Sequence, residues 1–250
     1  MILFGKKVPL LFSILLWFIF WEVIGRAKFS TIVPPFTSVI AAAITIVPTD
    51  KFNTAVWISL RSYGIGMALA LLIGIPIGAA MARVASLGRI LGMWVNIFVS
   101  APISALVPIL MAVIGIGETT VVVTVFLFAV FVIILDTRVG IRQADRSLVE
   151  MARCFGARRY QLYTKILLLS ALPEILAGVR LGAIRGVKGV VIGQLLVAIL
   201  GVGELFELYS QHFLMEEFWA LVIIVFMFAF AVSESIAFLE RRIEYYASAR

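Results

Sequence analysis

The chain has 250 residues, of which 63% are hydrophobic and 14% are charged, and its formal net charge is +7 at pH 7. Soluble globular domains are roughly half apolar and about a quarter charged, so this composition excludes a soluble domain and predicts an integral membrane protein. The basic charge does not call for a nucleic-acid partner, because Lys and Arg also gather in the cytoplasmic loops of membrane proteins. One Cys and one His exclude an internal disulfide and argue against a His-based metal site.

Six apolar segments are long enough to cross a membrane as helices, which takes about 20 residues. They are residues 8–25, 55–82, 88–115, 119–137, 173–200 and 217–239. The predicted fold is therefore all-α, a polytopic membrane protein with six transmembrane helices in a single domain over residues 1–250. The first segment has no small-residue cleavage site after it, so we interpret it as a retained helix and not a signal peptide.

The distribution of basic residues predicts the orientation. If both termini are cytoplasmic, 14 of the 21 Lys and Arg residues fall in cytoplasmic segments, 3 in external segments and 4 inside predicted helices. This bias follows the positive-inside rule, and it favours an even number of spans with both termini cytoplasmic. The predicted location is the cytoplasmic (inner) membrane of the cell.

The first long connection, residues 26–54, is predicted to be external. It contains VPPFTSVIAAAITIV at 33–47, a Pro-Pro turn followed by a short apolar stretch. Thr37 or Ser38 is a candidate N-cap for a helix there. Because this helix is too short to span, we expect it to lie along the membrane surface.

Two of the predicted spans contain residues that perturb helices. The third holds Pro102 and Pro108, and proline removes a backbone donor and kinks a helix. The second holds Gly64, Gly66, Gly74, Pro76 and Gly78, which permit either close helix packing or a bend. Packing is the more ordinary interpretation of such glycines. Breaks within a membrane are tolerated where protein or a cavity satisfies the freed carbonyls.

The second long connection, residues 138–172, is predicted to be cytoplasmic. SLVEMARCFGARRYQLY at 147–163 has the pattern of an amphipathic helix that turns near Gly156. Ser147 and Glu150 have the spacing of a capping box. This basic segment could lie on anionic lipid headgroups, or it could dock into a partner protein. Charge alone does not distinguish the two.

The same segment resembles the EAA loop of the permeases of type I ABC importers. That pattern begins Glu-Ala-Ala, continues to a Gly and, after nine intervening residues, reaches an aliphatic residue. Glu150, Met151, Ala152, Gly156 and Ile166 stand at those places, with Met151 replacing the first Ala. Ala157 and the later Pro173 are typical of the branch that includes permeases for aliphatic sulfonates, taurine, nitrate and bicarbonate.

Further motifs of that branch occur in the same order along the chain. They are VPPFTSVI at 33–40, Ser59-Leu60-Arg61, PILMAVIGIGE at 108–118, Gly178-Val179-Arg180 and Gly201-Val202-Gly203. The resemblance therefore extends along nearly the whole chain. It implies a single transmembrane permease domain in which the cytoplasmic segment is a coupling helix.

The resemblance also implies partners. The residues expected to contact a cytoplasmic ATPase are Glu150, Met151, Ala152, Arg153, Gly156, Ala157, Arg158 and Gln161. The chain lacks the GxxxxGK[ST] motif that cradles nucleotide phosphates, so ATP hydrolysis is expected in partner chains and this subunit is not expected to be an enzyme. The expected partners are two ATP-binding subunits, a second permease chain in a homodimer, an external solute-binding protein and membrane lipid, with no nucleic acid. No cofactor, metal or catalytic residue is expected.

Charged residues inside a membrane are functional candidates by default. Residues 173–200 would form about 42 Å of helix, so Arg180, near the start, can reach the membrane surface. Arg185 and Lys188 lie three residues apart on one helix face. They could line the path of an anionic substrate, or pair with phospholipid, Glu174 or a second subunit.

Gln194 stands where the branch often has Glu, and this exchange removes a negative charge from the candidate pathway. With Pro102, Pro108, Arg185 and Lys188, it completes the set of candidate pathway residues. The predicted function is the permease subunit of an ATP-driven importer for a small anionic solute of the sulfonate, nitrate, bicarbonate or carboxylate type. The alternative is a secondary transporter or channel that needs no ATPase, although such proteins often show internal repeats and midplane carboxylates.

Overall fold

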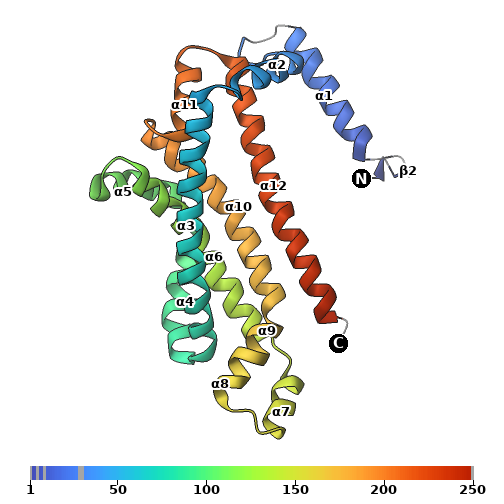
Figure 1. Cartoon of the computed structure of the whole chain (residues 1–250), viewed down its shortest axis with the longest axis vertical. Helices are drawn as coiled ribbons and strands as arrows, with labels where there is room; N and C mark the ends of the chain where they lie inside the picture. The colour runs from blue at the N-terminus through green and yellow to red at the C-terminus, as the bar shows by residue number, and fades with distance from the viewer. Residues whose placement is uncertain (1, 4–5, 8–9, 28–30, 249–250) are drawn as a thin grey trace.

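The computed structural model describes residues 2–3, 6–7, 10–27 and 31–248 (Figure 1). Its longer helices are α1 (Leu10–Arg26), α2 (Phe36–Ile46), α3 (Asp50–Arg83), α4 (Ala85–Ser100), α6 (Glu118–Arg142), α10 (Leu172–Val197), α11 (Gly201–Gln211) and α12 (Met215–Ser248). The shorter elements are the 3₁₀ helix η1 (Ile103–Leu106), α5 (Val107–Ile114), α7 (Arg146–Cys154), α8 (Arg159–Leu162), the π-helix η2 (Tyr163–Leu167) and α9 (Leu168–Ser170). The all-α prediction is confirmed, and β1 (Ile2–Leu3) and β2 (Lys6–Lys7) add a minimal antiparallel pair.

The centre of the fold is α6, which packs between α3 and α10. Both neighbours present glycines to it, and we call these two contact lines the glycine seams. A Cβ placed on Gly66 or Gly78 of α3 would come within 2.6 Å of α6 atoms, and one on Gly178 of α10 would lie 2.5 Å from the Cβ of Asp136. The helix backbones therefore approach as closely as they do because side chains are absent. Since α3 also runs unbroken through Pro76, packing is the correct interpretation of Gly66, Gly74 and Gly78, whereas Gly64 has no neighbour within 4 Å of an added Cβ.

The predicted third span, 88–115, is not one helix. It divides into α4 and the pair η1–α5, and the two parts are bent by 93°. Pro102 is the N-cap residue of η1 and Pro108 falls in the first turn of α5, where a missing N–H costs no helical hydrogen bond. The short α5 projects sideways from the bundle (Figure 1).

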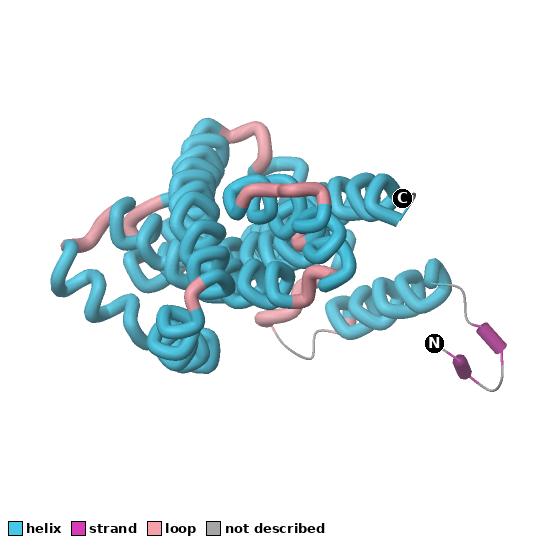
Figure 2. Tube along the Cα trace, turned by 90° about the horizontal axis from the view of Figure 1, so that it is seen from below, coloured by secondary structure: helices cyan, strands magenta, loops and turns pink. Residues whose placement is uncertain are grey.

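The predicted count of six spans is not established. By length and composition, α3, α6 and Met215–Phe238 of α12 can each cross a membrane. Two bent pairs, Ala85–Ser100 with Ile103–Ile114 and Arg159–Ser170 with Leu172–Val197, raise the number to five within the described residues. The first predicted span corresponds to α1, which has 17 residues and diverges from the bundle (Figures 1 and 2).

The short helix predicted in the first long connection exists as α2, but its predicted cap is wrong. Pro35 occupies the N-cap position and supplies no side-chain hydrogen bond. Glu22 of α1 performs this role, since its carboxylate accepts hydrogen bonds from the backbone N–H of Thr37 at 3.0 Å and from its hydroxyl at 2.9 Å. A negative charge at a helix N-terminus is stabilising, so α1 holds α2 in place.

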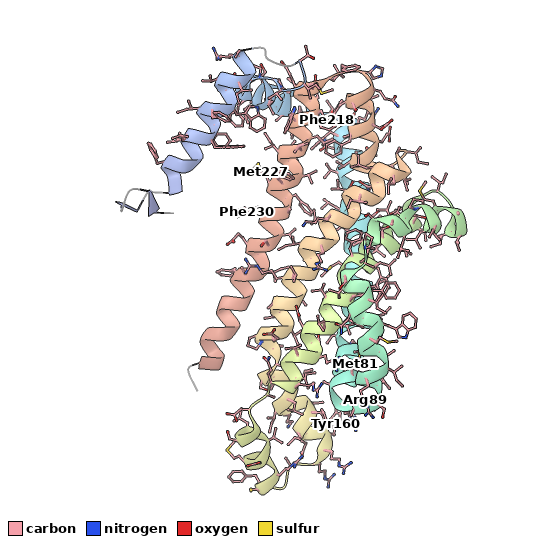
Figure 3. The ribbon with its side chains drawn as sticks, turned by 180° about the vertical axis from the view of Figure 1, so that it is seen from behind. Met81, Arg89, Tyr160, Phe218, Met227 and Phe230 are labelled. Atoms are coloured by element: carbon pink, nitrogen blue, oxygen red, sulfur yellow. The ribbon has the colours of Figure 1, made fainter. Side chains whose placement is uncertain are left out.

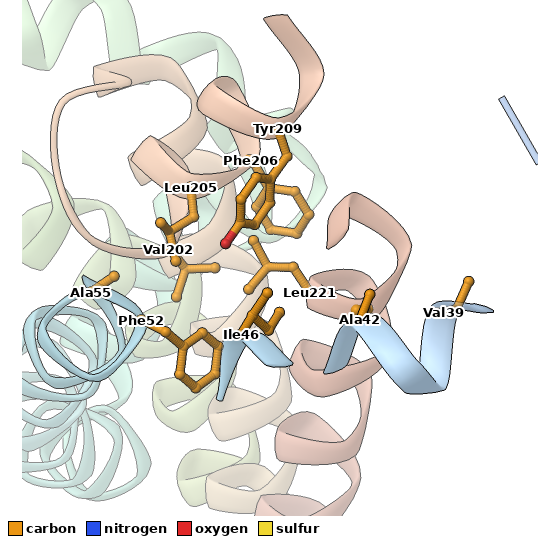
Figure 4. Packing of buried hydrophobic residues seen from close by; sticks show 11 residues of the cluster. Val39, Ala42, Ile46, Phe52, Ala55, Val202, Leu205, Phe206, Tyr209 and Leu221 are labelled. Atoms are coloured by element: carbon orange, nitrogen blue, oxygen red, sulfur yellow. The ribbon is translucent and has the colours of Figure 1, made fainter. Parts of the chain in front are cut away.

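Helix α11 was not expected from the sequence. It packs with α2, the start of α3 and α12 in an apolar cluster at the end of the molecule opposite α7 (Figures 1 and 4). The buried side chains of Ile46, Phe52, Leu205, Phe206 and Leu221 meet there. In contrast, Met227 and Phe230 of α12 are 66% and 68% exposed and point away from the bundle (Figure 3), as expected of a surface that contacts lipid.

Candidate functional site

The segment between α6 and α10 projects from one end of the bundle (Figure 1). Helix α7 begins one residue before the predicted cap, because Asp145 is the N-cap residue and its carboxylate accepts a hydrogen bond from the N–H of Ser147 at 2.9 Å. The predicted capping box at Ser147 and Glu150 is therefore wrong. The carboxylate of Asp145, and not the hydroxyl of Ser147, satisfies an orphan N–H at the start of α7.

The predicted turn at Gly156 is confirmed. Gly156 has φ +77°, its N–H donates to the carbonyl of Arg153, and the N–H of Ala157 donates to the carbonyl of Ala152. This pair of hydrogen bonds is the Schellman motif, which requires a left-handed residue after the helix. Nothing lies within 4 Å of the Cβ that another residue would add there, so the requirement for Gly comes from the backbone conformation alone.

After this turn the chain returns to the bundle. Gln161 accepts a hydrogen bond from the N–H of Arg158 at 2.9 Å and so holds the start of α8. The π-helix η2 and α9 then lead into α10, with a bend of 59° between 159–170 and 172–197. This bend is therefore part of the connection between α7 and α10.

Most residues predicted to contact an ATPase are on the free surface of this segment. Ala152 is buried and Ala157 is half-buried, whereas the others are exposed: Glu150, Met151, Arg153, Gly156, Arg158 and Gln161. Two apolar side chains stand among these charges, Met151 at 51% exposure and Phe155 at 86%. The segment thus offers a mixed apolar and charged surface that no other part of the described chain covers.

The candidate pathway residues separate into two groups. Pro102 and Pro108 are exposed at the break between α4 and α5. On α10, Lys188 is exposed and Arg185 is half-buried, and they share a face with the exposed Leu181. The glycines of α10 face α6, and Arg185 is near enough to that seam for its charge to act on the carboxyl group of Asp136, which faces Gly178. Within the described part of the chain, neither cation has a carboxylate within 4 Å, Glu174 included.

Gln194, the remaining candidate, is fully buried. Its Oε1 accepts hydrogen bonds from the hydroxyl of Ser59 at 2.8 Å and from the N–H of Val202 at 3.1 Å, while its Nε2 has no partner among the described residues. Gly201 and Gly203 leave no room for a side chain, because a Cβ on either would lie 2.3 Å from Gln194. Gln194 therefore connects α10 to α3 and α11 through buried hydrogen bonds. Its role in the translocation pathway stays a prediction.

Sequence reasoning missed two polar contacts of predicted helices. Arg61 pairs with Glu118 at 3.5 Å, which connects α3 to the start of α6. Arg180, for which we expected a reach to the membrane surface, donates from Nε to the hydroxyl of Ser233 on α12 at 3.4 Å. The only signal for either contact was the presence of a charge in an apolar segment.

The comparisons with known proteins agree with this geometry. Residues 70–245 match the family described as binding-protein-dependent transport system inner membrane component. The taurine transport system permease protein TauC of Escherichia coli is 26% identical over 231 residues, which are 90% of this chain and 84% of that protein. The carnitine transport permease protein OpuCD of Listeria monocytogenes is 31% identical over 140 residues, 56% of this chain and 62% of that protein.

Solved structures show the same fold. A chain of the inward-facing MetNI methionine ABC transporter matches with a TM-score of 0.67 at 20% identity, covering 77% of this chain and 95% of that one. A chain of an amino acid ABC transporter with histidines matches with a TM-score of 0.64 at 15% identity, covering 76% and 93%.

The fold and the family match define a multi-pass membrane transport subunit. The chain belongs to the family of binding-protein-dependent transport system inner membrane components. It is thus a permease subunit of an ABC importer and not itself an enzyme, and it works with ATPase subunits and a binding protein. Membership of this family argues against the ATPase-independent alternative.

Proposed function

We propose that the chain forms, as a homodimer, the pathway for a small anionic solute of the sulfonate, nitrate, bicarbonate or carboxylate type. The observation that carries this proposal is the position of Arg185 and Lys188. Lys188 lies 16 residues, or about 24 Å of helix, from the start of α10 at Leu172. A cation at that depth faces a water-filled cavity or a protein partner, because exposure to lipid is costly. Neither cation forms a salt bridge among the described residues, although the charge of Asp136 acts on Arg185 from α6; the pair would therefore still attract an anion, with Lys188 the less compensated of the two.

The segment 138–172 serves in this proposal as the coupling loop. Two ATP-binding subunits would contact it through Glu150, Met151, Arg153 and the Gly156 turn. Support comes from the exposed charges, from the apolar Met151 and Phe155 among them, and from the rigid Schellman turn, which presents α7 in a defined direction. Both termini would be cytoplasmic, on the same side as this segment.

The proposed mechanism is alternating access. Closure of the ATPase subunits on ATP would move the α7 segments of the two permease chains together. The motion would pass through η2 and α9 to α10, which carries Arg185 and Lys188. The pathway would then open outward to receive solute from the binding protein, and hydrolysis would reset it. No bond of the solute is made or broken.

The anion preference is testable in proteoliposomes that contain the permease, its cognate ATPase and its binding protein. Uptake of an alkanesulfonate, nitrate, bicarbonate and benzoate would be compared with uptake of cationic choline and of zwitterionic carnitine and taurine. We expect an anion to be transported, with at least a tenfold lower rate in Arg185→Gln and Lys188→Gln, on the scale of one lost charge interaction. Lys51→Gln is the matched control, since Lys51 lies outside the candidate pathway and pairs with Glu204.

The result that rejects the anion proposal is transport of a cationic or zwitterionic solute alone, or unchanged anion uptake in both variants. Neither outcome would affect the family assignment, because solute selection also depends on the binding protein.

The ATPase contact can be tested with the chain's single cysteine, Cys154, which is exposed at the end of α7. A benzophenone maleimide attached there should cross-link to an ATPase subunit on illumination. In the control, Cys154→Ser is combined with Thr54→Cys, which puts the probe on an exposed position near the start of α3. Equal cross-linking from the two positions, or none from Cys154, would reject the coupling role of this segment.

A further inference from the structure

A cavity of about 550 Å³ lies beside the link between the coupling segment and α10. Three parts of the chain form its wall: the end of α3, the end of α6 and the π-helical turn η2 with the start of α9. Ala80, Ile141 and Leu167 contribute apolar surface, and Arg83, Tyr163 and Thr164 contribute polar atoms. The cavity is therefore amphipathic, with one cationic group.

The cation is held in a defined position. Arg83 lies in the last turn of α3, and its guanidinium carbon is 4.8 Å from the centre of the Tyr163 ring. This distance is within the range of a cation–π interaction. Among the described side chains, no carboxylate lies within 4 Å of Arg83. Its N–H donors thus have no anionic partner among the described residues.

The location of the cavity suggests what supplies that anion. It lies at the end of the bundle that the positive-inside bias assigns to the cytoplasm, the end where Met81, Arg89 and Tyr160 are found (Figure 3). The cytoplasmic leaflet is rich in anionic lipid, and basic pockets between membrane helices on that side suit lipid headgroups. A small soluble anion would leave the apolar wall of the cavity uncovered, whereas the acyl chain of a lipid would pack against it.

We propose that this cavity binds an anionic phospholipid. The headgroup phosphate contacts the guanidinium of Arg83, and the beginning of one acyl chain lies against Ala80, Ile141 and Leu167. Arg is suited to this contact because its planar fork of donors matches phosphate oxygens. The inference does not depend on the identity of the solute or on the ATPase contact.

Occupancy of this site would bear on transport, because η2 forms part of its wall. The π-helix is rare and frequently marks functional sites. Here it presents Tyr163 to Arg83 and also lies within the 59° bend that leads into α10. A lipid bound between α3 and η2 would hold this bend in the arrangement seen in the structure.

The test measures lipid retention by the purified full-length chain. The protein is exchanged into nanodiscs of mixed phosphatidylglycerol and phosphatidylcholine, extracted gently, and examined by native mass spectrometry. We expect retained phosphatidylglycerol to fall about tenfold or more in Arg83→Gln, the scale of a lost charge-assisted hydrogen bond. Ala80→Trp should reduce it similarly by filling the apolar side of the cavity.

Arg89→Gln is the matched control, since Arg89 is an exposed cation at the same end of the molecule and does not line the cavity. It should retain phosphatidylglycerol as the wild type does. The proposal is overturned if Arg83→Gln and Arg89→Gln retain equal amounts, or if phosphatidylcholine is retained equally well. Displacement by inorganic phosphate alone would reassign the site to a free anion and overturn the lipid proposal.

Discussion

The glycine seam between α3 and α6 provides a test with a control two residues away. Gly66 faces α6, and a Cβ there would lie 2.6 Å from the Cβ of Val125 and 2.8 Å from the carbonyl oxygen of Val122. Gly64 is on the same helix, but no atom lies within 4 Å of the Cβ that Ala would add. Gly66→Ala should destabilise the fold, whereas Gly64→Ala should not.

The magnitude follows from comparing the two variants. Ala improves the helix propensity of both positions by up to about 1 kcal/mol, and this gain cancels in the comparison. Gly66→Ala adds an overlap of about 1 Å relative to the normal carbon–carbon contact distance. One clashing contact is with backbone, so relief requires the helices to separate. Overpacking of this kind costs about 1–3 kcal/mol, which is the expected difference in the free energy of unfolding.

The assay is equilibrium unfolding in mixed micelles with increasing dodecyl sulfate, followed by tryptophan fluorescence; the chain has five Trp residues. Gly66→Ala should unfold at a lower mole fraction of dodecyl sulfate than Gly64→Ala. Equal stability of the two variants would show that α3 and α6 do not approach each other at Gly66, and that the glycines serve another purpose.

Three further changes have expected outcomes. Gly156→Ala places a side chain at φ +77°, which costs about 1–2 kcal/mol. It should lower cross-linking of the coupling segment to the ATPase and reduce the free energy of unfolding by no more than this amount; unchanged cross-linking would contradict this interpretation. Gln194→Leu removes a buried acceptor of two hydrogen bonds and should lower the free energy of unfolding by about 1–3 kcal/mol. Ser59→Ala should show part of the same loss. If Gln194→Leu leaves the free energy of unfolding unchanged, Gln194 does not stabilise the contact between α3, α10 and α11. A double-mutant cycle of Arg61→Gln and Glu118→Gln should give a coupling energy below about 1 kcal/mol, because the pair is partly exposed. A larger coupling energy would mean that the pair is shielded from water in the assembled transporter.

The sequence predicted those features whose cause is local. Runs of apolar residues located α3, α6, α10 and α12, because the length of a spanning helix is determined by membrane thickness. The turn at Gly156 was predicted because only Gly readily adopts the left-handed conformation that ends such a helix.

Features that depend on distant contacts were not predicted. Pro102 indicated a kink, but the 93° bend also depends on how α5 and α6 meet. The contact between Gln194 and Ser59 joins residues 135 positions apart, and no spacing within the sequence encodes it. The N-cap of α7 was also predicted wrongly, because Asp145 and Ser147 are both good N-cap residues and the helix begins after the earlier one.

Helix α10 connects the link to the coupling segment, the glycine contacts with α6 and the hydrogen bonds of Gln194. Its first turn continues from the π-helical link, its glycine face lies on α6, and Gln194 near its other end is hydrogen-bonded to α3 and α11. Because the close glycine contacts leave no space for the helix to buckle toward α6, a push at the link would translate or rotate α10 as one body. The same motion would displace Lys188 and disturb the hydrogen bonds of Gln194 at once.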